Sequence, residues 1–304
     1  MDSTTGSAAK GNLLVIGARS LVGRRLRDAV SGWPGDVRFT SRQQLANQSL
    51  ILNFDRPEDF QPGLDFPTVI LCTPVWLVSD KLLTRLSELG MKRLIAFSST
   101  SLFTKDASDS DAERQVVRQL LDGEKSTVEF CEAKGVDWTI LRPTLIYDEG
   151  QDENVSRIAS MIQKLGFFPI CPPADGLRQP VHARELAAAA LQAAQSDVAR
   201  NKAYNLSGGE SLSYKTMVER VFAGLGRKPA ILAVPEGLWR FAFKVLDMLQ
   251  PNKALKRNIN MVLRMNQDLW FDNAPAVRDF GYAPGPFRPE FKKADDPSSI
   301  SSVS

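Results

Sequence analysis

A chain of 304 residues and 33.6 kDa, with 43% hydrophobic and 24% charged residues, has the composition of a globular protein that buries a full core in one large domain or two lobes. A net charge of +3, with no stripe of interleaved basic and aromatic residues, argues against nucleic-acid binding but suits a small anionic ligand. The three cysteines are widely spaced, so we expect no disulfide framework, no zinc site and a reducing, cytoplasmic location.

The two ends of the chain are predicted to be flexible tails. Residues 1–10 are small and polar and lack the apolar core of a secretory signal, and residues 293–304 are rich in serine. No stretch approaches 18 consecutive apolar residues, so the sequence predicts no membrane-spanning helix.

The first predicted element is a strand, a tight turn and a helix within Leu13–Leu26. Gly17 permits the turn, and Gly23 lets the helix pack closely on the strand. The N-terminus of such a helix offers unpaired backbone N–H groups and a partial positive charge, which suit a pyrophosphate. Ser20 stands where the usual pattern has its middle glycine, so an ordinary strand–turn–helix remains an alternative.

Strands and helices then alternate along the chain. Such alternation predicts an α/β fold, a Rossmann-like doubly wound parallel sheet with right-handed crossovers. The expected strands are Val37–Thr40, Leu50–Asn53, Thr68–Leu71, Arg93–Phe97 and Trp138–Leu141, and the expected helices are Asp80–Leu89 and Asp111–Ala133. Ligands of such sheets bind beyond the carboxyl ends of the strands, where polar and turn residues of this chain recur.

A smaller C-terminal substrate lobe is predicted after the sixth strand, because the strand–helix alternation stops there. Helices are expected at Val155–Leu165, Glu185–Ala194, Ser213–Gly224 and Trp239–Leu249, and a short strand at Ala203–Leu206. We therefore predict a dinucleotide-binding domain at 11–147, to which 178–208 return, and a substrate lobe made of 148–177 and 209–292.

Four segments together resemble the extended and atypical short-chain dehydrogenase/reductase superfamily, which includes NAD(P)-dependent epimerases and dehydratases. They are VIGARSLVGRRL, RLIAFSSTSLF, GVDWTILRPTLIYD and GLRQPVHARELAAA. Their order and spacing carry the resemblance, which spans about Asn12 to Pro289. The resemblance implies the Rossmann-like fold and a dinucleotide site, whereas a function does not follow from a fold alone.

The resemblance also suggests which cofactor is bound. NAD-binding members place an acidic residue at the end of the second strand, where this chain has Thr40–Ser41–Arg42. Arg19 in the glycine turn and Arg42 suit a 2′-phosphate, so NADP(H) is favoured over NAD(H). The alternative is that both arginines are solvated surface residues. The predicted cofactor-binding residues are Gly17, Arg19, Ser20, Leu21, Gly23, Arg42, Asp55, Cys72, Thr73, Pro74, Ser98 and Pro143.

Redox members of the family use a Tyr four residues before a Lys, because the Lys cation lowers the phenol pKa. Thr100 matches the family's assisting Ser/Thr, and Lys125 matches the Lys, but Leu121 occupies the Tyr position. No Tyr-x-x-x-Lys occurs anywhere in the chain. The predicted catalytic residues are therefore Thr100, Lys125 and Tyr147. Asp122 or Glu124 are alternative acid/base groups, and a substrate group or water is another.

On the substrate side, the resemblance implies that Arg178 and, on a looser alignment, Arg264 contact a diphosphate. Asn154 either caps the helix that follows or contacts substrate. The single histidine, His182, is interpreted as a structural anchor rather than a catalytic group. Without a second histidine or a carboxylate–histidine ligand set, we predict no metal.

Residues 235–264 mix bulky apolar side chains with lysines and arginines. Such a segment packs against the rest of the lobe, forms a homodimer contact, or lies at the inner face of a membrane as a peripheral anchor.

The sequence thus predicts an NADP(H)-binding oxidoreductase or epimerase-like protein with a non-standard acid/base. Its expected substrate is a nucleotide-linked or other anionic carbonyl or hydroxyl compound. The alternative is a catalytically silent dinucleotide-binding sensor or assembly subunit.

Overall fold

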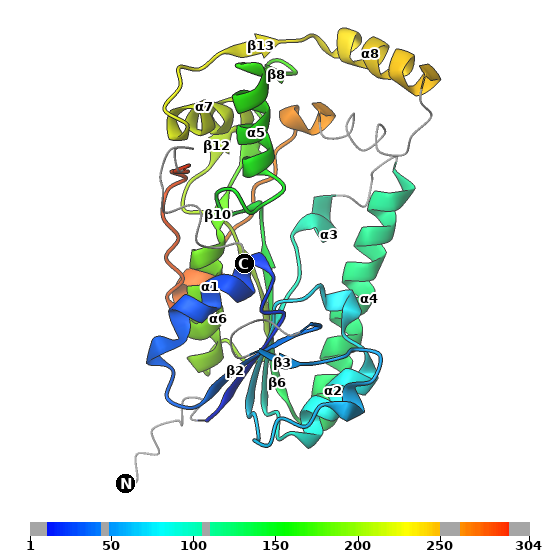
Figure 1. Cartoon of the computed structure of the whole chain (residues 1–304), viewed down its shortest axis with the longest axis vertical. Helices are drawn as coiled ribbons and strands as arrows, with labels where there is room; N and C mark the ends of the chain where they lie inside the picture. Colours follow the sequence, from blue (N-terminus) through cyan, green and yellow to red (C-terminus); the bar gives the residue numbers. More distant parts are fainter. Residues whose placement is uncertain (1–10, 44–48, 105–109, 250–261, 292–304) are drawn as a thin grey trace. The chain divides into compact units, whose positions relative to one another are not determined.

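The computed structural model describes residues 11–43, 49–104, 110–249 and 262–291 (Figure 1). The predicted tails at 1–10 and 293–304 lie outside these residues. The chain folds as two compact units. Unit 1 comprises Met1–Thr144, Val181–Ser207 and Phe271–Pro284, and unit 2 comprises Leu145–Pro180, Gly208–Trp270 and Gly285–Ser304.

Unit 1 is built on a seven-stranded sheet, which confirms the predicted doubly wound α/β fold. The strand order is β11-β6-β5-β4-β1-β2-β3, and every neighbouring pair is parallel. The strands are β1 (Leu13–Ile16), β2 (Val37–Ser41), β3 (Ser49–Ile51), β4 (Thr68–Leu71), β5 (Arg93–Phe97), β6 (Asp137–Pro143) and β11 (Lys202–Leu206). Because all strands run in one direction, their carboxyl ends meet along one edge, here called the carboxyl edge.

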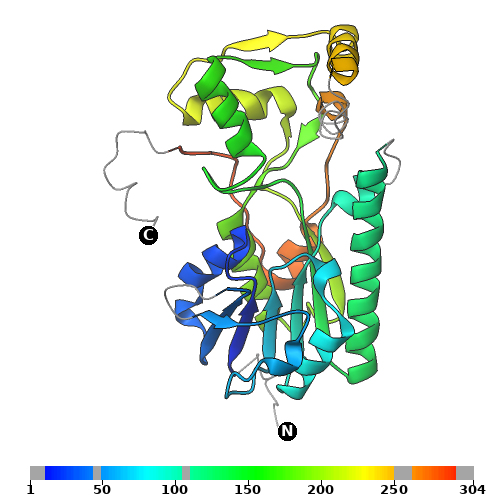
Figure 2. The same cartoon turned by 45° about the vertical axis from the view of Figure 1, so that its right-hand side comes forward.

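Helices cover both faces of this sheet, as a buried parallel sheet requires. On one face α1 (Leu21–Ala29) packs beside α6 (Ala183–Gln195), and on the other α2 (Asp80–Glu88) packs beside α4 (Asp111–Lys134) (Figures 1 and 2). The short elements of unit 1 are η1 (Val30–Gly32), η2 (Pro57–Asp59), η3 (Val75–Leu77), α3 (Ser101–Thr104), β10 (Val181–His182) and α10 (Ala274–Phe280).

Local sequence signals set the ends of these helices. The Ser20 side chain accepts a hydrogen bond from the Gly23 N–H at the start of α1, and Ser79 does the same for Leu82 at the start of α2. At its other end α4 stops at Gly135, whose left-handed φ of 64° suits glycine.

Unit 2 has its own apolar core, formed where α5 (Val155–Leu165) packs on α7 (Tyr214–Gly224). Its strands are short: β8 (Phe168–Ile170) pairs in parallel with β13 (Ile231–Ala233), and β9 (Leu177–Arg178) pairs antiparallel with β12 (Leu212–Ser213). The remaining elements are β7 (Ile146–Tyr147), α8 (Glu236–Leu249) and η4 (Arg264–Asn266).

The division of the chain differs from the predicted one at residues 271–284. We expected them in the smaller lobe, but they belong to unit 1. Polar contacts explain this: the Tyr282 hydroxyl donates to the Ser207 carbonyl at 2.8 Å, and the Asp279 carboxylate accepts from the Tyr204 hydroxyl at 2.7 Å and from Lys202 at 3.0 Å. Such long-range contacts leave no periodic signal in the sequence.

Candidate functional site: the carboxyl edge of unit 1

The turn between β1 and α1 is built around two glycines with no room for a side chain. Gly17 has a φ of 94°, and a Cβ on it would lie 2.9 Å from Thr73 Cγ2. A Cβ on Gly23 would lie 2.1 Å from the Gly17 carbonyl oxygen. The turn is therefore as tight as a phosphate-binding turn requires.

The first turn of α1 keeps backbone donors available. The N–H groups of Ser20 and Gly23 are used within the turn, and Ala18 N donates to Thr40 O at 3.0 Å. Within the described residues, no hydrogen bond uses the N–H of Leu21 or Val22. These two donors at a positively polarised helix end fit a pyrophosphate.

Arg19 lies beside the chain that leaves β2. Its guanidinium donates to the Gln43 side chain at 3.2 Å, and Arg42 is the exposed residue just before Gln43. The structure thus brings two cations to the carboxyl end of β2, where the residues Thr40, Ser41 and Arg42 include no carboxylate.

Two hydroxyls at the ends of β4 and β5 are buried without a hydrogen-bond partner within the described part of the chain. They are Thr73 Oγ1 and Ser98 Oγ. Leaving such groups unsatisfied costs free energy, so their presence at the carboxyl edge fits a polar ligand. The fit of a dinucleotide to this edge therefore rests on the tight glycine turn, the unused N–H groups and these two hydroxyls.

Other predicted cofactor residues lie along the same edge. Cys72 follows β4, and burial raises its thiol pKa while a hydrogen bond with Ser20 opposes that rise. Pro74 is exposed next to Thr73, and Pro143 ends β6. Asp55 is exposed beyond β3, in a turn where its N–H donates to the Asn53 side chain at 2.9 Å.

Thr100 is placed at the carboxyl edge as predicted, but its hydroxyl has a structural partner. It is buried, and Oγ1 donates to the Pro143 carbonyl at 3.1 Å. This bond ties the loop after β5 to the end of β6.

Lys125 does not lie where the family pattern predicted a catalytic lysine. Its side chain is 74% exposed, and its ammonium lies 3.9 Å from Glu129 on the same helix. Leu121, the expected Tyr position, and Asp122 are also exposed. The helix register explains this correction, because residues 121 and 125 share a face one turn apart that looks away from the sheet.

Glu124 occupies the inward position instead. Its carboxylate accepts from Arg142 Nε at 2.9 Å and also pairs with Nη2, and both side chains are largely buried. The Arg142 guanidinium in turn lies over the Phe103 ring, 5.5 Å from its centre. The sequence analysis named Glu124 only as an alternative acid/base group. The signal for its pairing was Arg142 in the sequence Leu141–Arg142–Pro143, a cation at the end of a predicted strand.

Two further polar groups at the end of β11 were missed by sequence reasoning. Asn205 Oδ1 and Ser207 Oγ are buried without a hydrogen-bond partner among the residues that the structure describes. The only available signal was their position after a predicted strand.

The remaining predicted catalytic residue, Tyr147, belongs to unit 2 and to its core. Its ring is buried and meets Phe287 edge-on, with ring centres 4.9 Å apart. The ring thus packs in the core of unit 2, whereas the sequence analysis predicted a catalytic acid/base group.

Arg178 is also used differently from the prediction. It is 4% exposed, and its guanidinium donates to the carbonyls of Leu177 and Gln267 at 2.7 Å and of Arg264 at 2.5 Å. It also lies over the Tyr214 ring, and burial lowers its pKa to about 10. Arg178 therefore clamps β9 to η4, which corrects the expected diphosphate contact. Arg264 contributes its carbonyl to this clamp.

The start of α5 is capped by Asp152 rather than by Asn154. The Asp152 carboxylate accepts from the Asn154 N–H at 2.7 Å and from the Ser156 N–H at 3.2 Å. The exposed Asn154 side chain makes no cap bond and donates to the Ile146 carbonyl at 3.3 Å. The capping alternative for Asn154 is therefore wrong, and its substrate contact stays a prediction.

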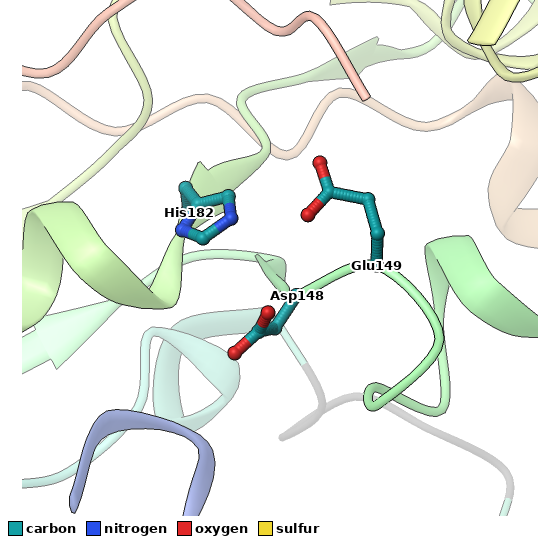
Figure 3. A group of neighbouring side chains, drawn as sticks. All are labelled: Asp148, Glu149 and His182. Atoms are coloured by element: carbon teal, nitrogen blue, oxygen red, sulfur yellow. The ribbon is translucent and has the colours of Figure 1, made fainter. Parts of the chain in front are cut away.

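His182 has the structural position that the sequence predicted. At the N-terminus of α6 its Nδ1 accepts from the Arg184 N–H at 2.9 Å, and the Glu185 carboxylate accepts from the His182 N–H at 3.1 Å. Figure 3 labels the side chains of His182, Asp148 and Glu149. Within unit 2 the Glu149 carboxylate accepts from the Glu290 N–H at 3.2 Å.

Comparisons with known proteins agree with this architecture. Residues 75–207 match the family model described as NAD dependent epimerase/dehydratase family. No curated protein matches the sequence.

Solved structures share the fold at low sequence identity. UDP-glucose 4-epimerase from Thermotoga maritima, solved with UDP-glucose, is 14% identical with a TM-score of 0.62, covering 90% of this chain and 93% of its own. UDP-glucuronic acid 4-epimerase from Bacillus cereus, solved with NAD, is 13% identical with a TM-score of 0.67, covering 91% and 92%. RMD from Pseudomonas aeruginosa, solved with NADPH, is 14% identical with a TM-score of 0.61, covering 90% and 93%.

Residues 75–207 are thus similar to the NAD dependent epimerase/dehydratase family, as the sequence segments suggested, and the chain shares the fold of these solved epimerase structures.

Proposed function

We propose that unit 1 binds NADP(H) at its carboxyl edge and that the protein acts as an oxidoreductase or epimerase on a nucleotide-linked or other anionic carbonyl or hydroxyl substrate. The observation that carries the proposal is the turn of Gly17 and Gly23, after which the N–H groups of Leu21 and Val22 have no partner among the residues that the structure describes. The family match, and neighbours solved with NAD or NADPH, support a nicotinamide dinucleotide.

In this proposal the residues of unit 1 hold successive parts of the cofactor. The first turn of α1 binds the pyrophosphate, and Arg19 and Arg42 bind the 2′-phosphate. Thr73 and Ser98, whose hydroxyls lack partners in the described chain, donate to the part of the dinucleotide beyond the pyrophosphate. The bound nicotinamide supplies a hydride donor or acceptor.

The preference for NADP(H) follows from charge at the end of β2. A carboxylate there would hydrogen-bond the ribose hydroxyls of NAD, whereas Arg19 and Arg42 attract the extra phosphate. The Arg19–Gln43 bond supports this reading, because it keeps the guanidinium beside β2.

The acid/base step is the least conventional part of the proposed reaction. Lys125 faces solvent, and Glu124 is held by Arg142. Thr100 orients a substrate hydroxyl or carbonyl in the proposal, since its oxygen keeps an unused lone pair while its proton is held by Pro143 O. The proton itself then comes from a substrate group or water.

A catalytically silent dinucleotide-binding protein is the second candidate. The observation that favours it is the inward face of α4, where Val117 and Leu120 stand in the two turns before Glu124. Val117 and Leu120 supply no proton donor, and the carboxylate of Glu124 is paired with Arg142.

The neighbours solved with UDP-glucose and other UDP-linked compounds support a nucleotide-linked substrate for the first candidate. Asn154 and Arg264 remain its proposed contacts in unit 2. The homodimer remains a prediction.

Dissociation constants for NADPH and NADH test the cofactor assignment. We expect NADPH to bind the full chain at least about tenfold more tightly, since charged hydrogen bonds contribute roughly 1.5–3 kcal/mol each. The double variant Arg19→Ala/Arg42→Ala should lose that difference and keep its NADH affinity. Tighter NADH binding, or an unchanged NADPH affinity in the double variant, would overturn the assignment.

Turnover distinguishes the two candidates. With NADPH bound, a set of nucleotide-linked sugars is offered to the chain, and product formation is followed together with absorbance of the reduced cofactor. Product formation supports the enzyme. Tight binding with no turnover of any member of the set supports the silent protein.

A further inference from the structure

The glycine turn before α1 is joined to the end of β2 by contacts from two consecutive residues. The Ala18 N–H donates to the Thr40 carbonyl at 3.0 Å, and the guanidinium of the next residue, Arg19, donates to the Gln43 side chain at 3.2 Å. All four residues belong to unit 1. The place of the Arg19 cation beside β2 is therefore set by the amide of Gln43.

The side chain of Gln43 has one orientation in this contact. An arginine side chain only donates hydrogen bonds, so Gln43 must accept through its oxygen Oε1. No described residue accepts a hydrogen bond from its Nε2, which therefore keeps two hydrogens to donate. The Gln43 carbonyl is held as well, because it accepts a hydrogen bond from the hydroxyl of the buried Ser41. Gln43 is thus fixed both at its backbone and at its amide oxygen.

The charge around this contact is positive. Arg19 and Arg42 are both exposed, and the residues from Thr40 to Gln43 include no carboxylate. The Arg19 guanidinium has five N–H groups, and one of them bonds to Gln43. The other four have no partner within the described part of the chain. These four N–H groups and the Nε2 of Gln43 are therefore left for an anion.

We propose that Gln43 sets the preference of the dinucleotide site for NADP(H). Its Oε1 holds Arg19 beside β2, and its Nε2 donates a hydrogen bond to the 2′-phosphate that Arg19 and Arg42 attract. Because the amide is neutral, it positions Arg19 without cancelling the charge of the guanidinium. This inference rests on the proposed NADP(H) site and names the residue that gives the site its specificity.

Replacing the amide with a carboxylate reverses the charge effect and keeps the shape. Gln43→Glu retains an oxygen for Arg19, but the new charge pairs with the guanidinium and repels a phosphate. A carboxylate at the end of the second strand also accepts hydrogen bonds from the ribose hydroxyls of NAD(H). This substitution therefore separates the charge of residue 43 from its position.

Fluorescence titration of the full chain with NADPH and with NADH tests the proposal. We expect Gln43→Glu to weaken NADPH binding by about tenfold or more, because it removes one hydrogen bond to the phosphate and opposes those of Arg19. NADH should bind equally well or more tightly. Gln43→Met removes the hydrogen bonds without adding a charge, so NADPH binding should weaken by roughly threefold to tenfold and NADH binding should not change.

Gln61→Glu is the matched control. Gln61 is an exposed glutamine of unit 1 whose side chain makes no hydrogen bond to another described residue. The variant adds the same charge at another place and should bind both cofactors like the unaltered chain. Adenosine 2′,5′-bisphosphate and adenosine 5′-monophosphate isolate the phosphate contact, and Gln43→Glu should weaken binding of the bisphosphate only. Thermal unfolding checks that all three variants keep their fold.

The outcomes distinguish this inference from the proposed function. An unaltered chain that binds neither cofactor, or that binds NADH more tightly than NADPH, overturns both before any variant is measured. If the unaltered chain prefers NADPH and Gln43→Glu and Gln61→Glu change that preference equally, the role of Gln43 alone is wrong. Equal weakening of NADPH and NADH binding in Gln43→Glu would also overturn it, because the substitution would then act on the glycine turn as a whole.

Discussion

Replacing Gly23 with alanine tests the turn that the proposed cofactor site depends on. An added Cβ would lie 2.1 Å from the Gly17 carbonyl oxygen and 2.9 Å from Ser20 Oγ. The carbonyl belongs to the backbone, so α1 must move away from β1. Overpacking of this kind costs about 1–3 kcal/mol, and the helix-forming preference of alanine recovers roughly 1 kcal/mol.

We therefore expect Gly23→Ala to unfold a few degrees lower and to lose most of its NADPH affinity, because the N–H groups of Leu21 and Val22 shift with the helix. Gly32→Ala is the matched control, since a Cβ there meets nothing within 4 Å. Thermal unfolding and fluorescence titration with NADPH measure both effects. Equal stability and equal affinity in the two variants would refute the reasoning.

Four other substitutions test the roles that the structure gives to Arg178, Glu124, Lys125 and Tyr204. Arg178→Lys should lower the free energy of unfolding by about 1–3 kcal/mol in urea, because an ammonium cannot reproduce the planar fork to three carbonyls; an unchanged midpoint would contradict the clamp. Glu124→Gln should lower the free energy of unfolding by about 3 kcal/mol, because it leaves the buried Arg142 guanidinium without its carboxylate partner. Lys125→Ala should change the free energy of unfolding by less than about 1 kcal/mol, because its ion pair is exposed. Equal losses in the two variants would contradict the inward position of Glu124 and the outward position of Lys125 on α4. The hydrogen bond from Tyr204 is the largest cause of the lowered Asp279 pKa of about 2, so the unaltered chain should lose stability as the pH falls from about 4 toward 2. Tyr204→Phe should make the melting temperature depend less on pH in this range. If the melting temperatures of the variant and of the unaltered chain fall in parallel, the Tyr204 hydrogen bond does not lower the Asp279 pKa.

The regular part of unit 1 could be predicted from local patterns. The strand Leu13–Ile16 is a continuous apolar run, and Thr68–Leu71 and Arg93–Phe97 are apolar after their first residue; all three occur in the structure with those bounds. The return of Phe271–Pro284 to unit 1 could not be predicted, because it depends on contacts far apart in the sequence.

The site was predictable where it depends on backbone shape and less so where it depends on helix register. Gly17 and Gly23 fall where the pattern placed them. Lys125 was assigned from the family spacing, although the inward residues of α4 recur at steps of three and four that include Glu124. That periodicity was available in the sequence. The burial of Arg178 was not, because its partners on η4 lie almost ninety residues away.

A structure of the full chain with NADPH bound tests the central claim most directly. We predict the pyrophosphate on the N–H groups of Leu21 and Val22, and the 2′-phosphate within hydrogen-bond distance of Arg19 or Arg42. A dinucleotide bound away from this turn, or a 2′-phosphate that neither arginine contacts, would contradict the account.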